Sequence, residues 1–273
     1  MTLNCNGTLL DLTQPKVMGV LNLTPDSFYD GGQHNHLDSA SKQCEKMLEE
    51  GADFIDLGAY SSRPGADNVS ENEEQNRLLP VLENLLKQFP EALFSIDTFR
   101  SQVAKEALDR GAHMINDISA GNLDSKMLAT VGKYSVPYIA MHMQGTPQDM
   151  QNVPHYNDPF AEIVQFFSEK IQACYAAGIN DVILDPGFGF GKSIQHNYHL
   201  LKRFEHLQQF NIPVLAGVSR KSMIYKTLDT TPEEALNGTT VLHTVALMKK
   251  AQLLRVHDVK EAKECIHLLA QLQ

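Results

Sequence analysis

Short apolar runs alternate along the chain with longer segments whose apolar residues recur at helical spacing. About eight such runs occur, at residues 17–21, 54–57, 93–96, 113–115, 137–141, 182–184, 214–218 and 253–256. Continuous apolar runs of this length are typical of strands buried on both faces of a parallel sheet. Residues 38–50 indicate one of the helices, because Ala40, Cys44 and Met47 share a face and Gly51 follows as a common helix end. The pattern predicts an α/β fold, the (β/α)₈ TIM barrel.

The beginning of the chain differs from this repeat. Asn6-Gly7 fits a tight turn, which predicts an N-terminal β-hairpin ahead of the barrel. A chain of 273 residues can form one large α/β domain or two small ones. Because no linker or low-complexity run interrupts the repeat, we expect a single domain over residues 1–273.

The composition limits the kinds of partner that the protein can bind and indicates its cellular compartment. The chain has 23 Lys and Arg against 33 Asp and Glu, a net charge of −10, so we expect no nonspecific binding to nucleic acid or to an anionic membrane. No apolar run approaches the roughly 20 residues of a membrane span. The four cysteines form no C-x-x-C pair, zinc-ligand spacings are absent, and the start lacks a basic and apolar leader. We therefore expect a cytoplasmic protein in a reducing compartment.

Polar residues stand where the predicted strands end. In this barrel the carboxyl ends of the strands carry the active site, whereas the opposite end serves stability. The residues are Asn22, Asp56, Asp97, Asn116 with Asp117, His142, Asp185, Arg220 with Lys221, and Arg255 with His257. Some of them would only cap loops. So many hydrogen-bonding groups on one rim exceed what capping needs and indicate an enzyme.

The most informative segment is Asp185-Pro-Gly-Phe-Gly-Phe-Gly-Lys192. Its glycines permit positive φ and close approach of a ligand, and we expect Phe188 and Phe190 to wall a flat ring. A phosphate-binding P-loop is excluded because Pro186 stands where that motif needs glycine, and the dinucleotide fingerprint fails on spacing. A loop that merely needs tight turns remains the alternative.

Two long segments follow the first two strands, at residues 24–32 and 61–67. The first is rich in turn residues and acids, including Asp26 and Asp30, and the second combines hydroxyls with Arg63. Both have the composition of active-site lids. Ordinary surface turns are the alternative.

Taken together, several motifs resemble the dihydropteroate synthase family. They are Met18-Gly-Val-Leu-Asn-Leu-Thr-Pro-Asp-Ser-Phe28, Ser62-Arg-Pro-Gly65, Asn116-Asp117, Met141-His-Met-Gln-Gly145, Asp185-Pro-Gly-Phe-Gly-Phe-Gly-Lys192, Ser219-Arg-Lys-Ser222 and Arg255-Val-His-Asp258. The resemblance implies a pterin-binding (β/α)₈ barrel that works with Mg²⁺, forms a homodimer through helices near its carboxyl terminus and is a sulfonamide target. It also implies a transferase of folate biosynthesis, which joins 6-hydroxymethyl-7,8-dihydropterin diphosphate to p-aminobenzoate and yields 7,8-dihydropteroate and pyrophosphate.

The resemblance implies that residues of this rim bind the hydrogen-bonding edge of the pterin. Asp185 would accept paired N–H bonds, Asn116 would supply a matched donor and acceptor, and Lys221 would donate to the acceptor side. The full set expected at the pterin is Asp97, Asn116, Met141, Asp185, Phe190, Lys221 and Arg255. Phe190 and the Arg255 guanidinium would flank the ring, with Met141 as an apolar floor.

The resemblance also implies which residues bind the diphosphate, the Mg²⁺ ion and the p-aminobenzoate. The diphosphate would meet Asn22, Arg255 and His257, and Asn22 would offer an oxygen to Mg²⁺; a buried structural role for His257 is the alternative. The p-aminobenzoate would lie among Phe28, Ser62, Arg63, Pro64, Phe190, Lys221 and Ser222. Asp97, Lys221 and Arg255 are the expected catalytic residues, since they would stabilise the cationic pterin and the departing anion.

The second loop departs from the family pattern. The family often has Gly-Gly-Glu-Ser-Thr-Arg-Pro-Gly, whereas this chain has Ala59 for a glycine and Tyr60 for the acid. Ser62 keeps the hydroxyl of the threonine position. This change concerns the p-aminobenzoate and sulfonamide side and leaves the pterin residues unaltered.

Two other functions would use the same barrel. A pterin-binding methyltransferase domain would need neither a diphosphate clamp nor a site for the aminobenzoate carboxylate, which the segments Thr24–Phe28 and Ser219–Ser222 indicate. A non-catalytic pterin-binding paralogue should have lost part of the clamp, yet Asn22, Arg255 and His257 are all present.

Overall fold

A computed structural model describes residues 1–23, 33–60, 69–150 and 154–272. In this part of the chain, eight parallel strands form one sheet, in the order β8-β7-β6-β5-β4-β3-β10-β9. A bridge between Leu184 and Val214 joins β8 to the residues just before β9 and closes the sheet into a barrel. The strands are β3 (Lys16–Asn22), β4 (Phe54–Gly58), β5 (Phe94–Asp97), β6 (Met114–Asp117), β7 (Tyr138–Met141), β8 (Val182–Asp185), β9 (Leu215–Ala216) and β10 (Leu253–Val256). The predicted TIM barrel is confirmed.

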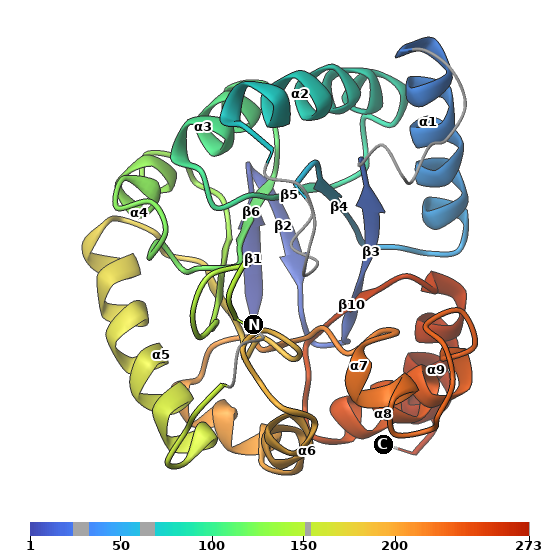
Figure 1. Cartoon of the computed structure of the whole chain (residues 1–273). Helices are drawn as coiled ribbons and strands as arrows, with labels where there is room; N and C mark the ends of the chain where they lie inside the picture. The colour runs from blue at the N-terminus through green and yellow to red at the C-terminus, as the bar shows by residue number, and fades with distance from the viewer. Residues whose placement is uncertain (24–32, 61–68, 151–153, 273) are drawn as a thin grey trace.

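Helices surround the strands as an outer ring (Figure 1). They are α1 (Gln33–Glu49), α2 (Glu71–Gln88), α3 (Ser101–Asp109), α4 (Met127–Val131), α5 (Pro159–Ala176), α6 (Ile194–Lys202), the 3₁₀ helix η2 (Phe204–Phe210), α7 (Ser222–Tyr225), α8 (Leu236–Met248) and α9 (Val259–Ala270). Local sequence explains several boundaries. The Ser70 hydroxyl accepts the Glu73 N–H at 3.2 Å to begin α2, and Gly51 has a φ of 95° just beyond α1.

The predicted hairpin is also confirmed and closes one end of the barrel. Strands β1 (Thr2–Cys5) and β2 (Thr8–Asp11) pair antiparallel across the Asn6-Gly7 turn and lie across the middle of the ring in Figure 1. Their Leu3 and Cys5 pack with Phe54, Met114 and other apolar residues from the first halves of the strands. This cluster fills the amino end of the barrel, so the carboxyl end is left for chemistry.

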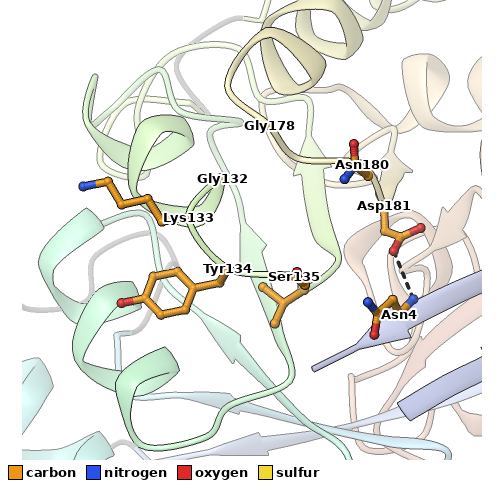
Figure 2. A pocket seen from close by; sticks show the side chains of 9 residues that line it. Asn4, Gly132, Lys133, Tyr134, Ser135, Gly178, Asn180 and Asp181 are labelled. Carbon is orange, nitrogen blue, oxygen red and sulfur yellow. Dashed lines mark hydrogen bonds between the residues drawn. The ribbon is translucent and has the colours of Figure 1, made fainter. Parts of the chain in front are cut away.

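A polar pocket of about 120 Å³ lies at the amino end. Its lining comes from Asn4 of β1, from residues 132–136 before β7, and from Gly178, Asn180 and Asp181 before β8. Figure 2 shows the Asp181 carboxylate directed at the Asn4 backbone N–H, which donates to it at 3.0 Å. The pocket is therefore at the opposite end from the rim that the sequence singles out.

The described helices include none long and apolar enough to cross a membrane.

Candidate active site

Strand register sets several rim residues at one level. Asn22 pairs with Gly58 across β3 and β4, Gly58 pairs with Asp97 across β4 and β5, and Asp97 pairs with Asn116 across β5 and β6. Side chains at one level of a parallel barrel point to the same side of the sheet. A Cβ added at Gly58 would lie 3.5 Å from the Asp97 Cβ, an ordinary contact distance, so Gly58 and Asp97 are direct neighbours across the two strands.

Arg255 connects three strands at the centre of this rim. Its Nε donates to Asp56 Oδ2 and its Nη2 donates to Asp97 Oδ2, both at 2.7 Å. Asn116 Nδ2 donates to the same Asp56 oxygen at 2.9 Å. Three residues expected at the pterin, Asp97, Asn116 and Arg255, are therefore brought together around one buried carboxylate.

Asp56 is the functional candidate to which the sequence analysis gave no role. Its side chain is fully buried, and its Oδ1 has no hydrogen-bond partner within the described part of the chain. A buried carboxylate oxygen without a donor is costly unless a ligand supplies one. The available signal was its place at the end of β4, but sequence alone does not reveal that one oxygen is left for a ligand.

The electrostatics of Asp97 follow from this crowding. Burial raises the pKa of Asp97 to about 7, with Arg255 opposing the rise and the carboxylates of Asp56, Glu74 and Asp117 adding to it. The Asp97 side chain still keeps 22% of its surface exposed, so it is reachable from the barrel mouth. Burial opposes the charge of Arg255, yet Asp56 and Asp97 together raise its pKa above the ordinary value, and it stays a cation.

Asp185 and Lys221 form the second half of the site. The Gly187 N–H donates to Asp185 Oδ1 at 2.7 Å, and burial raises the pKa of this carboxyl while Lys221 opposes the rise. Burial lowers the pKa of Lys221 to about 8, with Asp185 opposing the shift. The Lys221 Nζ donates to the Phe188 carbonyl at 2.5 Å and lies 4.8 Å from the centre of the Phe190 ring. Met141 pairs with Asp185 across β7 and β8 and is buried.

The two phenylalanines of the glycine-rich loop separate. Phe188 is fully buried and stacks on Phe204, with ring centres 6.1 Å apart, so the expectation that it walls a ligand is wrong. Phe190 is half-buried beneath Lys221. Gly187 and Gly189 have positive φ angles, of 68° and 82°. They interrupt the regular alternation of side chains, and the Phe188 ring turns into the core.

The end of β10 and the loop after β9 contribute polar groups of two kinds. His257 is exposed just beyond Arg255, and its Nδ1 lies 3.0 Å from the Ser219 Oγ. Arg220 is occupied elsewhere: its Nε and Nη2 donate to Asp258, both at 2.8 Å, and its Nη1 donates to two loop carbonyls. Ser222 is half-buried at the first position of α7. Arg220 therefore ties its loop together, whereas His257 directly follows β10 and Ser222 begins the helix after β9.

Two further rim residues have structural partners. Asp117 accepts from the Tyr138 hydroxyl at 2.6 Å, the Ser119 N–H at 2.8 Å and the Gly121 N–H at 2.7 Å, which makes it the cap of its own turn. His142 is buried with its Nδ1 3.0 Å from Lys192 Nζ.

The expected residues Phe28, Ser62, Arg63 and Pro64, together with Asp26 and Asp30, lie outside the described residues. Tyr60 and Val69 border the second of these segments, and Arg100 contacts both. Its guanidinium carbon lies 5.4 Å from the centre of the Tyr60 ring, and its Nη2 donates to the Val69 carbonyl at 2.6 Å.

For a metal, Asn22 offers an amide oxygen at the end of β3, where it is half-buried. The described residues contain no group of three or more His, Cys, Asp and Glu placed to hold an ion.

Comparison with known proteins agrees with this geometry. The family model described as "Pterin binding enzyme" matches residues 18–257. The dihydropteroate synthase of Escherichia coli strain K12 is 46% identical over 271 residues, which cover 98% of this chain and 95% of that protein. The Yersinia pestis dihydropteroate synthase in complex with a sulfonamide drug superposes with a TM-score of 0.93 at 45% identity, over 100% of this chain and 99% of the other. The Xanthomonas albilineans enzyme with 4-aminobenzoic acid superposes with a TM-score of 0.93 at 41% identity, over 100% and 98%.

Proposed function

Because the chain belongs to the dihydropteroate synthases of the pterin-binding enzyme family, we propose a division of the synthase reaction among the residues of its carboxyl rim. In that reaction the bond between the pterin CH₂ carbon and the diphosphate oxygen breaks, and a bond from that carbon to the p-aminobenzoate nitrogen forms. Pyrophosphate takes the bonding electrons, and the new amine loses a proton. The observation that carries the proposal is the Arg255 network, in which one cation joins Asp56 to Asp97 while Asn116 donates to the same Asp56 oxygen.

The pterin binds between the two halves of the rim. Asp185 and the unpartnered Asp56 oxygen accept N–H bonds from the amino-pyrimidine edge, and Asn116 supplies a donor and an acceptor. Lys221 donates to the acceptor side of the ring. Phe190 and the Arg255 guanidinium flank its faces over Met141, as aromatic and cationic planes do.

The diphosphate binds at the outer edge of the same rim. Arg255 gives two of its five N–H donors to Asp56 and Asp97 among the described residues, so further donors remain for a diphosphate oxygen. His257 directly follows β10 and Asn22 ends β3, and these two strands are adjacent in the sheet. As pyrophosphate leaves, Arg255 stabilises the developing anion and Asp97 stabilises the positive charge on the pterin.

The rim also fits Mg²⁺ at Asn22. An amide oxygen is a hard ligand, and Mg²⁺ keeps several of its waters and is commonly shared with substrate phosphates. When bound, the ion supplies positive charge to the departing pyrophosphate.

The p-aminobenzoate approaches from the side of Phe190, Lys221 and Ser222. Phe28, Ser62, Arg63 and Pro64 complete this side in the proposal, on the strength of their motifs alone. A weak neutral amine needs no strong base, because its nucleophilic lone pair is already free before it attacks.

Two features of the whole chain belong to the proposal. The chain works as one domain, since the family match spans residues 18–257 and the hairpin before it packs into the barrel. A cytoplasmic, reducing location accords with Cys5, Cys44, Cys174 and Cys265, all of which are buried free thiols.

A homodimer is proposed on the carboxyl-terminal helices. Helices α8 and α9 pack together, and on them Val241, Met248 and Leu268 are 53%, 70% and 71% exposed. Leu272, just after α9, is 82% exposed. Large apolar side chains gathered on neighbouring helices favour a subunit interface.

Calorimetry of an Asp185 variant tests the pterin assignment. Asp185→Asn keeps the shape of the side chain but removes a charged acceptor, so we expect 6-hydroxymethyl-7,8-dihydropterin to bind at least about 10-fold more weakly. Asp109→Asn is the matched control, because its exposed carboxylate pairs with Lys105 on the surface of α3. Equal pterin affinity in wild-type and Asp185→Asn protein would refute the assignment.

A further inference from the structure

Lys192 is a buried lysine that none of the substrate assignments uses. It ends the glycine-rich loop after β8, and only 4% of its surface is exposed. Its Nζ lies 2.9 Å from the Gly187 carbonyl, 2.9 Å from the Phe190 carbonyl and 3.2 Å from the His142 carbonyl. The His142 Nδ1 is a fourth contact, at 3.0 Å. The ammonium therefore sits in a cage built by two loops, one after β7 and one after β8.

The chemistry of this cage is that of a small monovalent cation site. An ammonium has three N–H donors and no acceptor, and the cage offers three carbonyl oxygens and a ring nitrogen. Burial, with Lys192 adding to it, lowers the pKa of His142 to about 2, so its ring is neutral and Nδ1 can accept. Burial lowers the pKa of Lys192 to about 7, while Asp185 favours its charged form and Lys221 opposes it.

Glycines bring the two loops close enough to need such a cation. A Cβ at Gly187 would lie 2.0 Å from the His142 carbonyl oxygen, and one at Gly191 would lie 2.4 Å from the Gln144 carbonyl oxygen. Several carbonyl oxygens are thereby turned toward one point inside the protein. Their negative ends repel one another in a medium of low dielectric constant unless a positive group lies between them.

The same loop also holds the pterin groups. Its Gly187 N–H donates to Asp185, its Phe188 carbonyl holds Lys221 Nζ, and its Phe190 ring lies beneath that lysine. Any change in the loop backbone would therefore displace three parts of the pocket at once. Asn197 steadies the loop as well, by accepting the Gly189 N–H at 2.8 Å.

We propose that the Lys192 ammonium is the internal cation of the loop from Gly187 to Phe190, a positioning residue that sets Asp185, Phe190 and Lys221 for the pterin without touching it. The inference rests on the proposed pterin pocket. It makes the loop a preformed part of the site, held from behind by a charge that belongs to the chain itself.

Chemical rescue tests the proposal. Lys192→Ala leaves the carbonyl cage without its cation, so the KM for the pterin diphosphate should rise at least about 10-fold while kcat at saturation changes less than about 3-fold. Propylammonium, which replaces the removed stem and charge, should restore most of the lost affinity at millimolar concentration. Propanol has nearly the same shape without the charge and should restore none.

Two variants control for a general loss of structure. Lys192→Met keeps most of the stem without the charge, so it should bind pterin as weakly as Lys192→Ala and gain nothing from propylammonium. Lys202→Ala removes an exposed lysine of α6 and should behave as the wild type. If Lys192→Ala does not fold alone, its folded yield with propylammonium against propanol becomes the readout.

The outcomes separate this proposal from the pocket itself. Wild-type pterin affinity in Lys192→Met, or an equal effect of propylammonium and propanol on Lys192→Ala, would overturn the role of Lys192. A loss of affinity in Asp185→Asn together with wild-type affinity in Lys192→Met would leave the pocket standing and remove only this inference. Unchanged affinity in Asp185→Asn would remove the pocket.

Discussion

Asp97 is the residue whose charge state matters most in this site. Its carboxyl lies among the carboxylates of Asp56, Glu74 and Asp117 and one cation, Arg255, and burial with these neighbours raises its pKa to about 7. A carboxylate that titrates near neutral pH can change charge within the working range of the enzyme. Its proposed task, stabilising a cationic pterin, needs the ionised form.

Ionisation of Asp97 should therefore give the pH profile of kcat/KM an acidic limb near pH 7, and an alkaline limb should follow as Lys192 and Lys221, with pKa values of about 7 and 8, lose their charges. Below about 7 the free enzyme holds Asp97 protonated and loses the stabilising charge, and above it the carboxylate is present. Asp97→Asn should lower kcat/KM about 100-fold and abolish this acidic limb. Steady-state assays over a series of pH values measure both. An unchanged acidic limb in Asp97→Asn would show that another group titrates.

The raised pKa of Asp97 also makes the free energy of unfolding depend on pH. The folded state holds the Asp97 proton up to about pH 7, whereas the unfolded chain releases it near 3.8, so the folded protein binds more protons between these values. The contribution of this group to the free energy of unfolding is thus complete below about pH 4 and is lost as the pH rises through 7.

Among the elements, a buried ion pair joins α2 to the segment between β5 and α3. Glu74 of α2 is fully buried, accepts the Thr98 hydroxyl at 2.6 Å and pairs with Arg100 Nη1. Arg100 also donates to the Val69 carbonyl and faces the rings of Tyr60 and Phe99, at 5.4 Å and 5.0 Å. Tyr60 thus presents an aromatic face to the Arg100 cation.

Removing one partner of this pair should cost far more than replacing both. Arg100→Met leaves the Glu74 charge buried without its cation, so we expect the free energy of unfolding to fall by about 3 kcal/mol or more. Adding Glu74→Leu to that variant should recover most of the loss, because a buried apolar pair has no charge to desolvate. Urea unfolding of the two variants measures both values. No recovery in the double variant would mean that the loss comes from the Val69 and Tyr60 contacts.

Sequence patterns predicted the elements well and the side-chain partners less well. Strand runs and glycine ends depend on neighbours a few residues away, so the barrel, its hairpin and the rim could be predicted. The contacts that side chains make with distant segments could not be predicted from such local patterns. Phe188 turns into the core because of glycine φ angles, and Arg220 pairs with Asp258, 38 residues further along the chain. The unpartnered oxygen of Asp56 likewise depends on Arg255, 199 residues away.

At the scale of the whole molecule, the exposed apolar side chains of α8 and α9 lead to a prediction about assembly. Met248→Glu places a charge within the proposed interface, so the dimer should dissociate at least about 10-fold more readily, as measured by analytical ultracentrifugation. Leu9→Glu changes an exposed leucine of the hairpin, 73% exposed, and should leave the dimer intact. A dimer equally stable in both variants would place the interface elsewhere.

In the proposed function, this rim makes dihydropteroate from two bound substrates. The most direct measurement follows pyrophosphate release and dihydropteroate formation from 6-hydroxymethyl-7,8-dihydropterin diphosphate with Mg²⁺, with and without p-aminobenzoate. We predict dihydropteroate in step with pyrophosphate when p-aminobenzoate is present, and a loss of at least about 100-fold in Arg255→Met. Tight pterin binding without any product, or full activity in Arg255→Met, would contradict the account.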